Sequence, residues 1–255
     1  MKKIPLILIG LIIPCLLFGI WILAERMNWL DPVLFPGPLA VRDILSLMLA
    51  DGSLGKNMTV SFFRLGAGFL MALGLALPLG FLLGQIRFLH RLLMPTLAFF
   101  QQIPPIAWIP FFMLWLGLGE MSKIAVITYS AFVPVFLNTV QGVQSLDPLL
   151  RETAHSFRLS PWQMIWRVHL PSAAGPLFVG VRLGLSNSWR ALVGAELIAA
   201  SSGIGALIME GRQQMQPAKS ILAILIIGLA GALLDTLLRF LERHLVPWQT
   251  AGRRS

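Results

Sequence analysis

The side chains that could do chemistry gather in one stretch of this 255-residue chain, from Asp147 to Pro171. Charged groups and imidazoles stand there between long apolar runs; they are Arg151, Glu152, His155, Arg158, Arg167 and His169. A magnesium-dependent enzyme would need closely paired carboxylates, whereas Asp147 and Glu152 lie five positions apart. The four histidines, His90, His155, His169 and His244, lack the spacing of metal ligands. The sequence therefore predicts no catalytic residue, no bound cofactor and no metal site.

The same stretch carries two helix starts. Asp147 is a good N-cap, and Pro148 follows at the first helical position, where a missing N–H costs nothing. Ser160 is a second N-cap residue, and Gln163 three residues later completes a capping box. Pro171 is expected to stop the second helix before the next apolar run. We therefore expect a helix–turn–helix that lies outside any bilayer.

The composition indicates an integral membrane protein. Hydrophobic residues make up 56% of the chain and charged residues 12%, whereas about a quarter of a soluble domain is charged. The net charge of +9 is attributed to basic cytoplasmic loops, because no basic run is interleaved with exposed aromatic residues as nucleic-acid binding would require. The single cysteine, Cys15, excludes an internal disulfide.

The apolar runs predict an all-α fold with six transmembrane helices. The run after Lys2 and Lys3 is too long for a signal peptide, so residues 1–24 are expected to form an uncleaved first span. In a periplasmic segment, 25–57, Pro38 opens an amphipathic helix that runs to about Leu49 along the outer surface. The core is placed at 58–245, with spans at about 58–84, 92–116, 123–143, 173–200 and 219–241, a loop at 144–172 and a basic tail at 246–255.

The distribution of cations sets the orientation. Segments assigned to the inner side hold more Lys and Arg than those assigned to the outer side, where acidic residues balance them. Because Lys and Arg accumulate in cytoplasmic loops, we expect both termini and the 144–172 loop on the cytoplasmic side.

The third span contains a predicted break. Prolines 104, 105 and 110 remove backbone donors, so this helix must break or kink inside the membrane. Such a break is tolerated where the backbone is buried in protein or lines a wet cavity. Gln101, Gln102, Pro104, Pro105 and Trp108 are therefore candidates for the wall of a translocation path. The alternative is that the two glutamines hold helices together.

Other polar groups lie within the later spans. Asn138 in the fourth span and Glu196 in the fifth are further candidates for the path. Ionisable groups in apolar runs face a partner or a wet cavity, so Glu196, Arg182 and Arg64 could equally form ion pairs between helices. Gly80 and Gly84 form a small-xxx-small pair, which predicts a close helix contact.

The loop resembles the EAA loop of ABC importer permeases. Glu152, Thr153 and Ala154 are followed at the family's spacing by Val168, Leu170 and Pro171, with Arg158 in place of the usual glycine. If the residue at that position adopts a left-handed conformation, a residue other than glycine costs roughly 1 kcal/mol there. The segments FPGP, IPPIAWIP and AELIAASSGIG are similar to permeases of the nitrate, sulfonate and taurine group.

This resemblance implies a type I ABC importer permease of the bacterial inner membrane. Glu152, Thr153, Ala154, Arg158, Leu170 and Pro171 would then couple the chain to a separate ATPase. The implied complex contains a second copy of the chain, two ATPase subunits and an extracytoplasmic substrate-binding protein. The two copies of the chain lie in the lipid bilayer, and no nucleic acid takes part. ATP and magnesium would belong to the ATPase, because the nearest match to a Walker loop, at Gly55-Lys56, lacks the first glycine and the Ser or Thr.

Several alternatives remain at this point. Within the same group the solute could be a vitamin or pyrimidine precursor instead of a sulfonate, nitrate or taurine. An ion-driven secondary transporter would also explain a broken third helix, but it would not explain the doubly capped loop. An integral-membrane enzyme would need a catalytic cluster that the sequence lacks.

Overall fold

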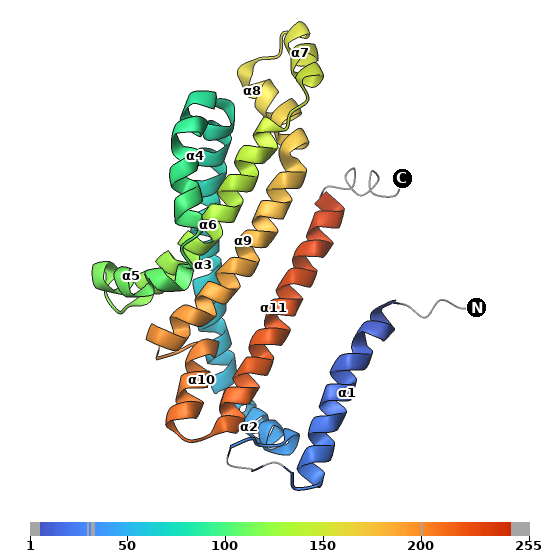
Figure 1. Cartoon of the computed structure of the whole chain (residues 1–255), viewed down its shortest axis with the longest axis vertical. Helices are drawn as coiled ribbons and strands as arrows, with labels where there is room; N and C mark the ends of the chain where they lie inside the picture. Colours follow the sequence, from blue (N-terminus) through green and yellow to red (C-terminus); the bar gives the residue numbers. More distant parts are fainter. Residues whose placement is uncertain (1–5, 30, 32–33, 200, 246–255) are drawn as a thin grey trace, which may run out of the picture.

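The computed structural model describes residues 6–29, 31, 34–199 and 201–245, and over these residues it consists of helices joined by turns, with no strand. The chain forms a long bundle, with α7 and α8 at one end and α2 and α10 at the other (Figure 1). The elements are α1 Leu6–Arg26, α2 Pro38–Ala50, α3 Ser53–Gln85, α4 Arg87–Gln101, the 3-10 turn η1 Pro105–Trp108, α5 Ile109–Leu116, α6 Glu120–Gln144, α7 Pro148–Ser156, α8 Pro161–Met164, the π-helical turn η2 Ile165–His169, α9 Leu170–Ala199, α10 Ile204–Gln213 and α11 Pro217–Leu245.

Helices α3, α6 and α9 form the tightly packed centre of the bundle. Small residues allow this closeness: a Cβ added to Gly80 of α3 would lie 2.9 Å from the Phe136 carbonyl oxygen of α6. At Gly84 it would lie 2.6 Å from Val143 Cβ, and at Gly180 of α9 it would lie 2.7 Å from Asn138 Cβ. The close contact predicted for the Gly80–Gly84 pair is therefore confirmed, and α6 is the partner helix.

Four helical segments, 53–85, 120–144, 162–213 and 217–242, are long and apolar enough to cross a membrane within the described residues. A fifth crossing is possible if 88–101 and 105–116 together form one span, since they meet at 88°. The predicted break in the third span is thus confirmed, and α5 turns away from the bundle (Figure 1). The predicted first span coincides with most of α1, whereas residues 1–5 and the tail 246–255 lie outside the described residues.

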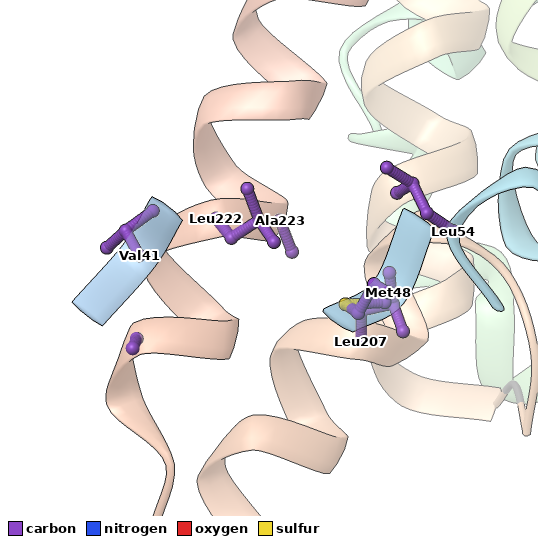
Figure 2. Close-up of a cluster of buried hydrophobic side chains, with 7 residues drawn as sticks. Val41, Met48, Leu54, Leu207, Leu222 and Ala223 are labelled. Atoms are coloured by element: carbon purple, nitrogen blue, oxygen red, sulfur yellow. The ribbon is translucent and has the colours of Figure 1, made fainter. Parts of the chain in front are cut away.

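The end of the bundle opposite α7 is closed by an apolar cluster of α2, α10 and the start of α11. Figure 2 shows Val41 and Met48 of α2 beside Leu222 and Ala223 of α11 and Leu207 of α10. The amphipathic helix predicted from Pro38 is confirmed as α2. Helix α10, between the spans predicted at 173–200 and 219–241, was not predicted, because residues 201–218 were assigned only to the outer side.

Helix α1 stands apart from the central bundle (Figure 1). Its described contact with the rest of the chain is at its C-terminal end, where Trp21 packs against the α2 cluster and its Nε1 donates to the Pro36 carbonyl, 3.3 Å away. The side chains of residues 12–20 of α1 are exposed and available to lipid or to another chain.

One helix boundary was predicted wrongly. Pro171 was expected to stop the second loop helix, yet α8 continues through η2 into α9 without an interruption. A proline in a helix lacks an N–H and crowds the carbonyl four residues earlier. The π-helical turn places a wider ring there, in which the Leu170 N–H donates to the carbonyl of Ile165, five residues back. Pro171 is therefore accommodated and does not end the helix.

Candidate functional site

The caps predicted for the 147–171 loop are present. The Leu149 N–H donates to Asp147 Oδ1 at 2.9 Å, which starts α7. The Gln163 N–H donates to Ser160 Oγ at 3.3 Å, and the Ser160 N–H donates to Gln163 Oε1 at 3.0 Å, which completes the reciprocal capping box. Local hydrogen bonds therefore shape this loop before it meets any partner.

The turn between the two loop helices has a left-handed residue. Arg158 has φ +50°, and the Leu159 N–H donates to the Ala154 carbonyl at 3.4 Å, five residues back. This is a helix C-cap of the Schellman type, in which the left-handed residue is usually a glycine and is here an arginine. The strain anticipated for a non-glycine residue at this position is present in the fold.

The residues of the candidate coupling loop differ in exposure. Glu152, Thr153, Arg158, Leu170 and Pro171 are exposed, whereas Ala154 is buried against the bundle. The Glu152 side chain also borders a cleft with Gln85, His90, Arg91 and Gln144 from the adjoining ends of α3, α4 and α6. The loop thus rests on the bundle through Ala154 and presents Glu152 outward.

The exposed face of the loop is apolar as well as charged. Phe157 is 76% exposed and Trp162 66% exposed, and the rings of Trp162 and Trp166 lie 5.5 Å apart. Leu149 and Leu150 of α7 are exposed beside them. Large aromatic side chains on a short capped hairpin are characteristic of a protein contact surface.

The break in the third span is held together by a tyrosine. Pro104 has no N–H to donate to the Phe100 carbonyl, which accepts instead from the Ile103 N–H at 3.1 Å and from Tyr129 Oη of α6 at 2.9 Å. The side chains of Gln101, Gln102 and Pro104 are exposed, and Pro105 is half-buried. The break therefore leaves two amide side chains facing outward from the bundle.

Trp108 is the centre of an aromatic cluster beside the break. Its ring lies within 6.3 Å of four others, those of Phe100, Phe111, Phe112 and Tyr129. Among the described residues its Nε1, though buried, has no hydrogen-bond acceptor. Trp108 thus packs the inside of the bend while its N–H group stays available.

Asn138 and Glu196 are placed differently from the residues at the break. Asn138 Nδ2 donates to the Pro134 carbonyl of its own helix at 2.8 Å, and its Cβ lies against Gly180. Glu196 is fully buried and pairs with Arg64, whose Nη1 lies 2.8 Å from Glu196 Oε1. For Glu196 the structure therefore shows the ion pair that was the alternative to a path residue.

The Arg64–Glu196 pair belongs to a larger network that reaches the surface at Glu120, whose side chain is 52% exposed. Arg64 also contacts Glu120 at 2.6 Å through Nε and donates to the Ser202 carbonyl at 2.6 Å. Ser61 Oγ donates to Glu196 Oε1 at 2.7 Å, and the Gly205 N–H donates to Glu196 Oε2 at 2.9 Å. The network ties α3, α6 and α9 to the turn that precedes α10.

Gly203 is required in that turn. Its φ of +113° lies in a region that side-chain-bearing residues rarely adopt, and an added Cβ would lie 2.6 Å or less from the Glu196 carboxylate oxygens. Sequence reasoning flagged Arg64 and Glu196 but missed Glu120, which was assigned to an outer turn. A carboxylate in the first turn of an apolar helix was the available signal.

A second ion pair lies further along α9. Arg182 Nε contacts Asp235 Oδ1 of α11 at 2.8 Å, and Asp235 also contacts Arg239 at 2.7 Å. Asp235 was missed in the sequence, although an acidic residue in the last apolar run indicates a basic partner. The ion pair expected as one option for Arg182 is confirmed.

Over its described residues the chain is a helical protein with several helices apolar enough to cross a membrane, a break between α4 and α5, and an exposed loop of two capped helices. Residues 76–249 match the family described as binding-protein-dependent transport system inner membrane component. The chain belongs to this family of ABC importer permeases, and it is therefore a transport subunit and not a catalytic enzyme.

Three named relatives match most of the chain. A putative aliphatic sulfonates transport permease protein, SsuC of Bacillus subtilis, is 34% identical over 95% of this chain and 88% of its own length. The taurine transport system permease protein TauC of Escherichia coli is 30% identical over 91% of this chain and 86% of its own length. The nitrate import permease protein NrtB of a Synechocystis strain is 33% identical over 77% of this chain and 72% of its own length.

The fold is also similar to a solved structure. A chain of the MetNI methionine ABC transporter, in inward-facing conformations, superposes with a TM-score of 0.56 at 20% identity. The match covers 71% of this chain and 92% of that chain. At this identity the similarity concerns the type I permease fold alone.

Proposed function

We propose that this chain is the permease of an importer that carries a small oxyanion, of the sulfonate, taurine or nitrate kind, into the bacterial cytoplasm. The observation that carries the proposal is that relatives at 30–34% identity are named for aliphatic sulfonates, taurine and nitrate. These solutes share a compact anionic group of oxygen atoms, so one type of permease would suit all of them.

The proposed topology has six spans. Helix α1 and the bent pair of α4 and α5 join the four long apolar helices, with both termini and the 147–171 loop in the cytoplasm of the inner membrane. The excess of Lys and Arg in the segments on that side supports this orientation. Residues 246–255 would then form a cytoplasmic tail.

The proposed assembly is a homodimer with two ATPase subunits and an extracytoplasmic binding protein. ATP and magnesium would be held by the ATPase, because this chain has no Walker loop. Its exposed apolar faces support a membrane-embedded dimer: Leu114 of α5 is 79% exposed, and Trp115 beside it is 64% exposed. Such side chains require lipid or a second copy of the chain.

The loop from Asp147 to Pro171 is the proposed contact with the ATPase. Glu152, Thr153 and Arg158 would provide polar contacts, and the exposed Phe157 and Trp162 would fill an apolar groove. Because Leu170 and Pro171 continue into α9 without a break, movement of the loop would be transmitted directly to a span. Closure of the ATPase dimer would thereby alternate the access of the path, in which Gln101, Gln102, Pro104, Pro105 and Trp108 are proposed to lie.

A charge reversal in the loop tests this function. The chain is co-purified with its ATPase and binding protein, and uptake of a labelled sulfonate, taurine or nitrate is measured in proteoliposomes. Glu152→Lys should abolish uptake and the stimulation of ATP hydrolysis by the binding protein, while the protein still inserts. Asp43→Lys, which reverses an exposed carboxylate of α2 at the other end of the bundle, is the matched control and should retain uptake. Normal uptake by the Glu152→Lys complex would refute the coupling role.

A further inference from the structure

Arg190 is a charged residue within the long apolar helix α9. It is exposed, and its hydrogen bond to a described residue is a long one, from Nη1 to Asn187 Oδ1 at 3.4 Å. Among the described residues no carboxylate lies within 4.0 Å of it. An arginine inside an apolar span is costly unless it meets an anion or a water-filled cavity.

Three other basic residues of the described spans have carboxylate partners. Arg64 is bound by Glu120 and Glu196, and Lys123 is bound by Glu120 at 3.1 Å. On the same helix as Arg190, Arg182 is bound by Asp235. Arg190 differs from these three in having no carboxylate partner among the described residues.

A cleft of about 670 Å³ lies between α9 and α11 and has Arg190 in its wall. Ser186 and Asn187 line it beside Arg190, so one turn of α9 offers a hydroxyl, an amide and a guanidinium. The acidic lining groups, Asp235 and Glu242, lie near Arg182, at 2.8 and 4.0 Å. Arg182 is eight residues from Arg190, or roughly 12 Å along the helix. The two carboxylates beside Arg182 therefore do not pair with the guanidinium of Arg190.

The same face of α9 leads to the break in the third span. Gly194 is one turn beyond Arg190, and a Cβ added to it would lie 3.3 Å from Ile106 Cδ1 of η1. The broken segment therefore covers this face immediately next to Arg190. A solute that passed the break would meet Arg190 and Asn187 next.

We propose that Arg190, with Asn187 and Ser186, forms an oxyanion-binding position in the translocation route, a specificity-determining site for the sulfonate or related group of the solute. This inference rests on the proposed function and assigns a residue to the step after the break. The guanidinium pairs with two oxygens of the anion, while the amide and hydroxyl donate to the third. A single arginine without a buried cage binds weakly, which suits a site that a solute must also leave.

Thiol labelling tests the site without any transport assay. Ser186→Cys is introduced together with Cys15→Ala, which removes the chain's one native cysteine, and is reacted in the assembled complex with an anionic sulfonatoethyl or a cationic trimethylammonioethyl methanethiosulfonate. The thiolate attacks the sulfenyl sulfur, a disulfide forms and methanesulfinate leaves. The rates are compared with those at Ser46→Cys, an exposed position of α2.

The expected result is a preference for the anionic reagent at position 186, relative to position 46, that Arg190→Gln lowers on the order of ten-fold. Excess sulfonate should slow the reaction at position 186 alone. If neither charged reagent reacts, the face is covered by lipid or by the second copy and the inference is overturned. An unchanged preference in Arg190→Gln would also overturn it.

Uptake by the reconstituted complex supplies the second measurement. Arg190→Gln should raise KM or lower kcat for the oxyanion by roughly ten-fold, Arg190→Lys should restore most of the loss, and the surface variant Arg42→Gln should match the wild type. ATP hydrolysis should still respond to the binding protein in Arg190→Gln. If that variant separates the dimer, Arg190 is an interface residue and the inference fails. If the wild-type complex imports no oxyanion, the proposed function fails, and the labelling result still decides the site.

Discussion

Arg64 of α3 and Glu196 of α9 form an ion pair of 2.8 Å in which the side chains are 1% and 0% exposed. Neither helix could hold its charge alone in an apolar bundle, because an isolated buried ion is strongly disfavoured. Ser61 and the Gly205 N–H satisfy further lone pairs of the carboxylate. The pair therefore fixes how α3, α9 and the turn before α10 sit together.

The first prediction concerns this pair. Arg64→Gln leaves Glu196 charged and without its cation, so the free energy of unfolding should fall by about 3–5 kcal/mol. Thermal unfolding of the detergent-solubilised protein measures the change. Arg42→Gln, whose exposed partner is Asp43, is the control and should change stability by about 0–1 kcal/mol.

The double variant Arg64→Gln with Glu196→Gln separates charge from packing. If charge is the cause, the double variant should be more stable than Arg64→Gln alone, because the uncompensated carboxylate is gone. Simple additivity of the two losses would contradict the proposed origin of the stability.

Much of the local structure could be predicted from the sequence because its causes are local. The caps at Asp147 and Ser160, the break after Gln102 and the start of α2 at Pro38 each follow from residues a few positions apart. The close contact at Gly80 could be predicted too, since small residues at this spacing serve mainly to admit another helix.

Features that depend on distant residues could not be predicted in the same way. Glu120 and Glu196 both form ion pairs with Arg64, but a single sequence does not show which helices are neighbours. Helix α10 was missed because its apolar face becomes evident only beside α2 and α11. At Pro171 the rule that proline ends a helix was outweighed by a π-helical turn, which has no clear sequence signal.

The second prediction compares two glycines on α3. Gly80→Ala places a Cβ 2.8 Å from Thr139 Cβ and 2.9 Å from a backbone oxygen of α6, so it should destabilise the protein by about 1–3 kcal/mol. Gly74→Ala meets nothing within 4 Å and should stabilise the helix by up to about 1 kcal/mol. Thermal unfolding of both variants measures the two changes in stability. Changes of the same sign in the two variants would contradict the packing of α3 on α6.

The third prediction concerns the left-handed turn at Arg158. Arg158→Gly removes the strain of a side chain at φ +50° and should stabilise the folded loop by roughly 1 kcal/mol. Hydrogen exchange of the amides of Phe157 and Leu159, whose bonds close the turn, should slow about five-fold. Arg158→Ala keeps the Cβ and should leave exchange unchanged, so equal slowing in both variants would refute the backbone explanation.

The fourth prediction concerns the tyrosine that supports the break. Tyr129→Phe leaves the Phe100 carbonyl without its partner on α6, and the loss should amount to about 0.5–1.5 kcal/mol. Because the bond joins the end of α4 to α6, amides around the break, at Ile103 and Ala107, should exchange faster while those of α9 stay protected. Phe132→Leu, a change one turn along α6 that touches no such bond, should not have this local effect. If Tyr129→Phe loosens the whole bundle equally, the tyrosine acts through general packing and the break is supported by its own backbone.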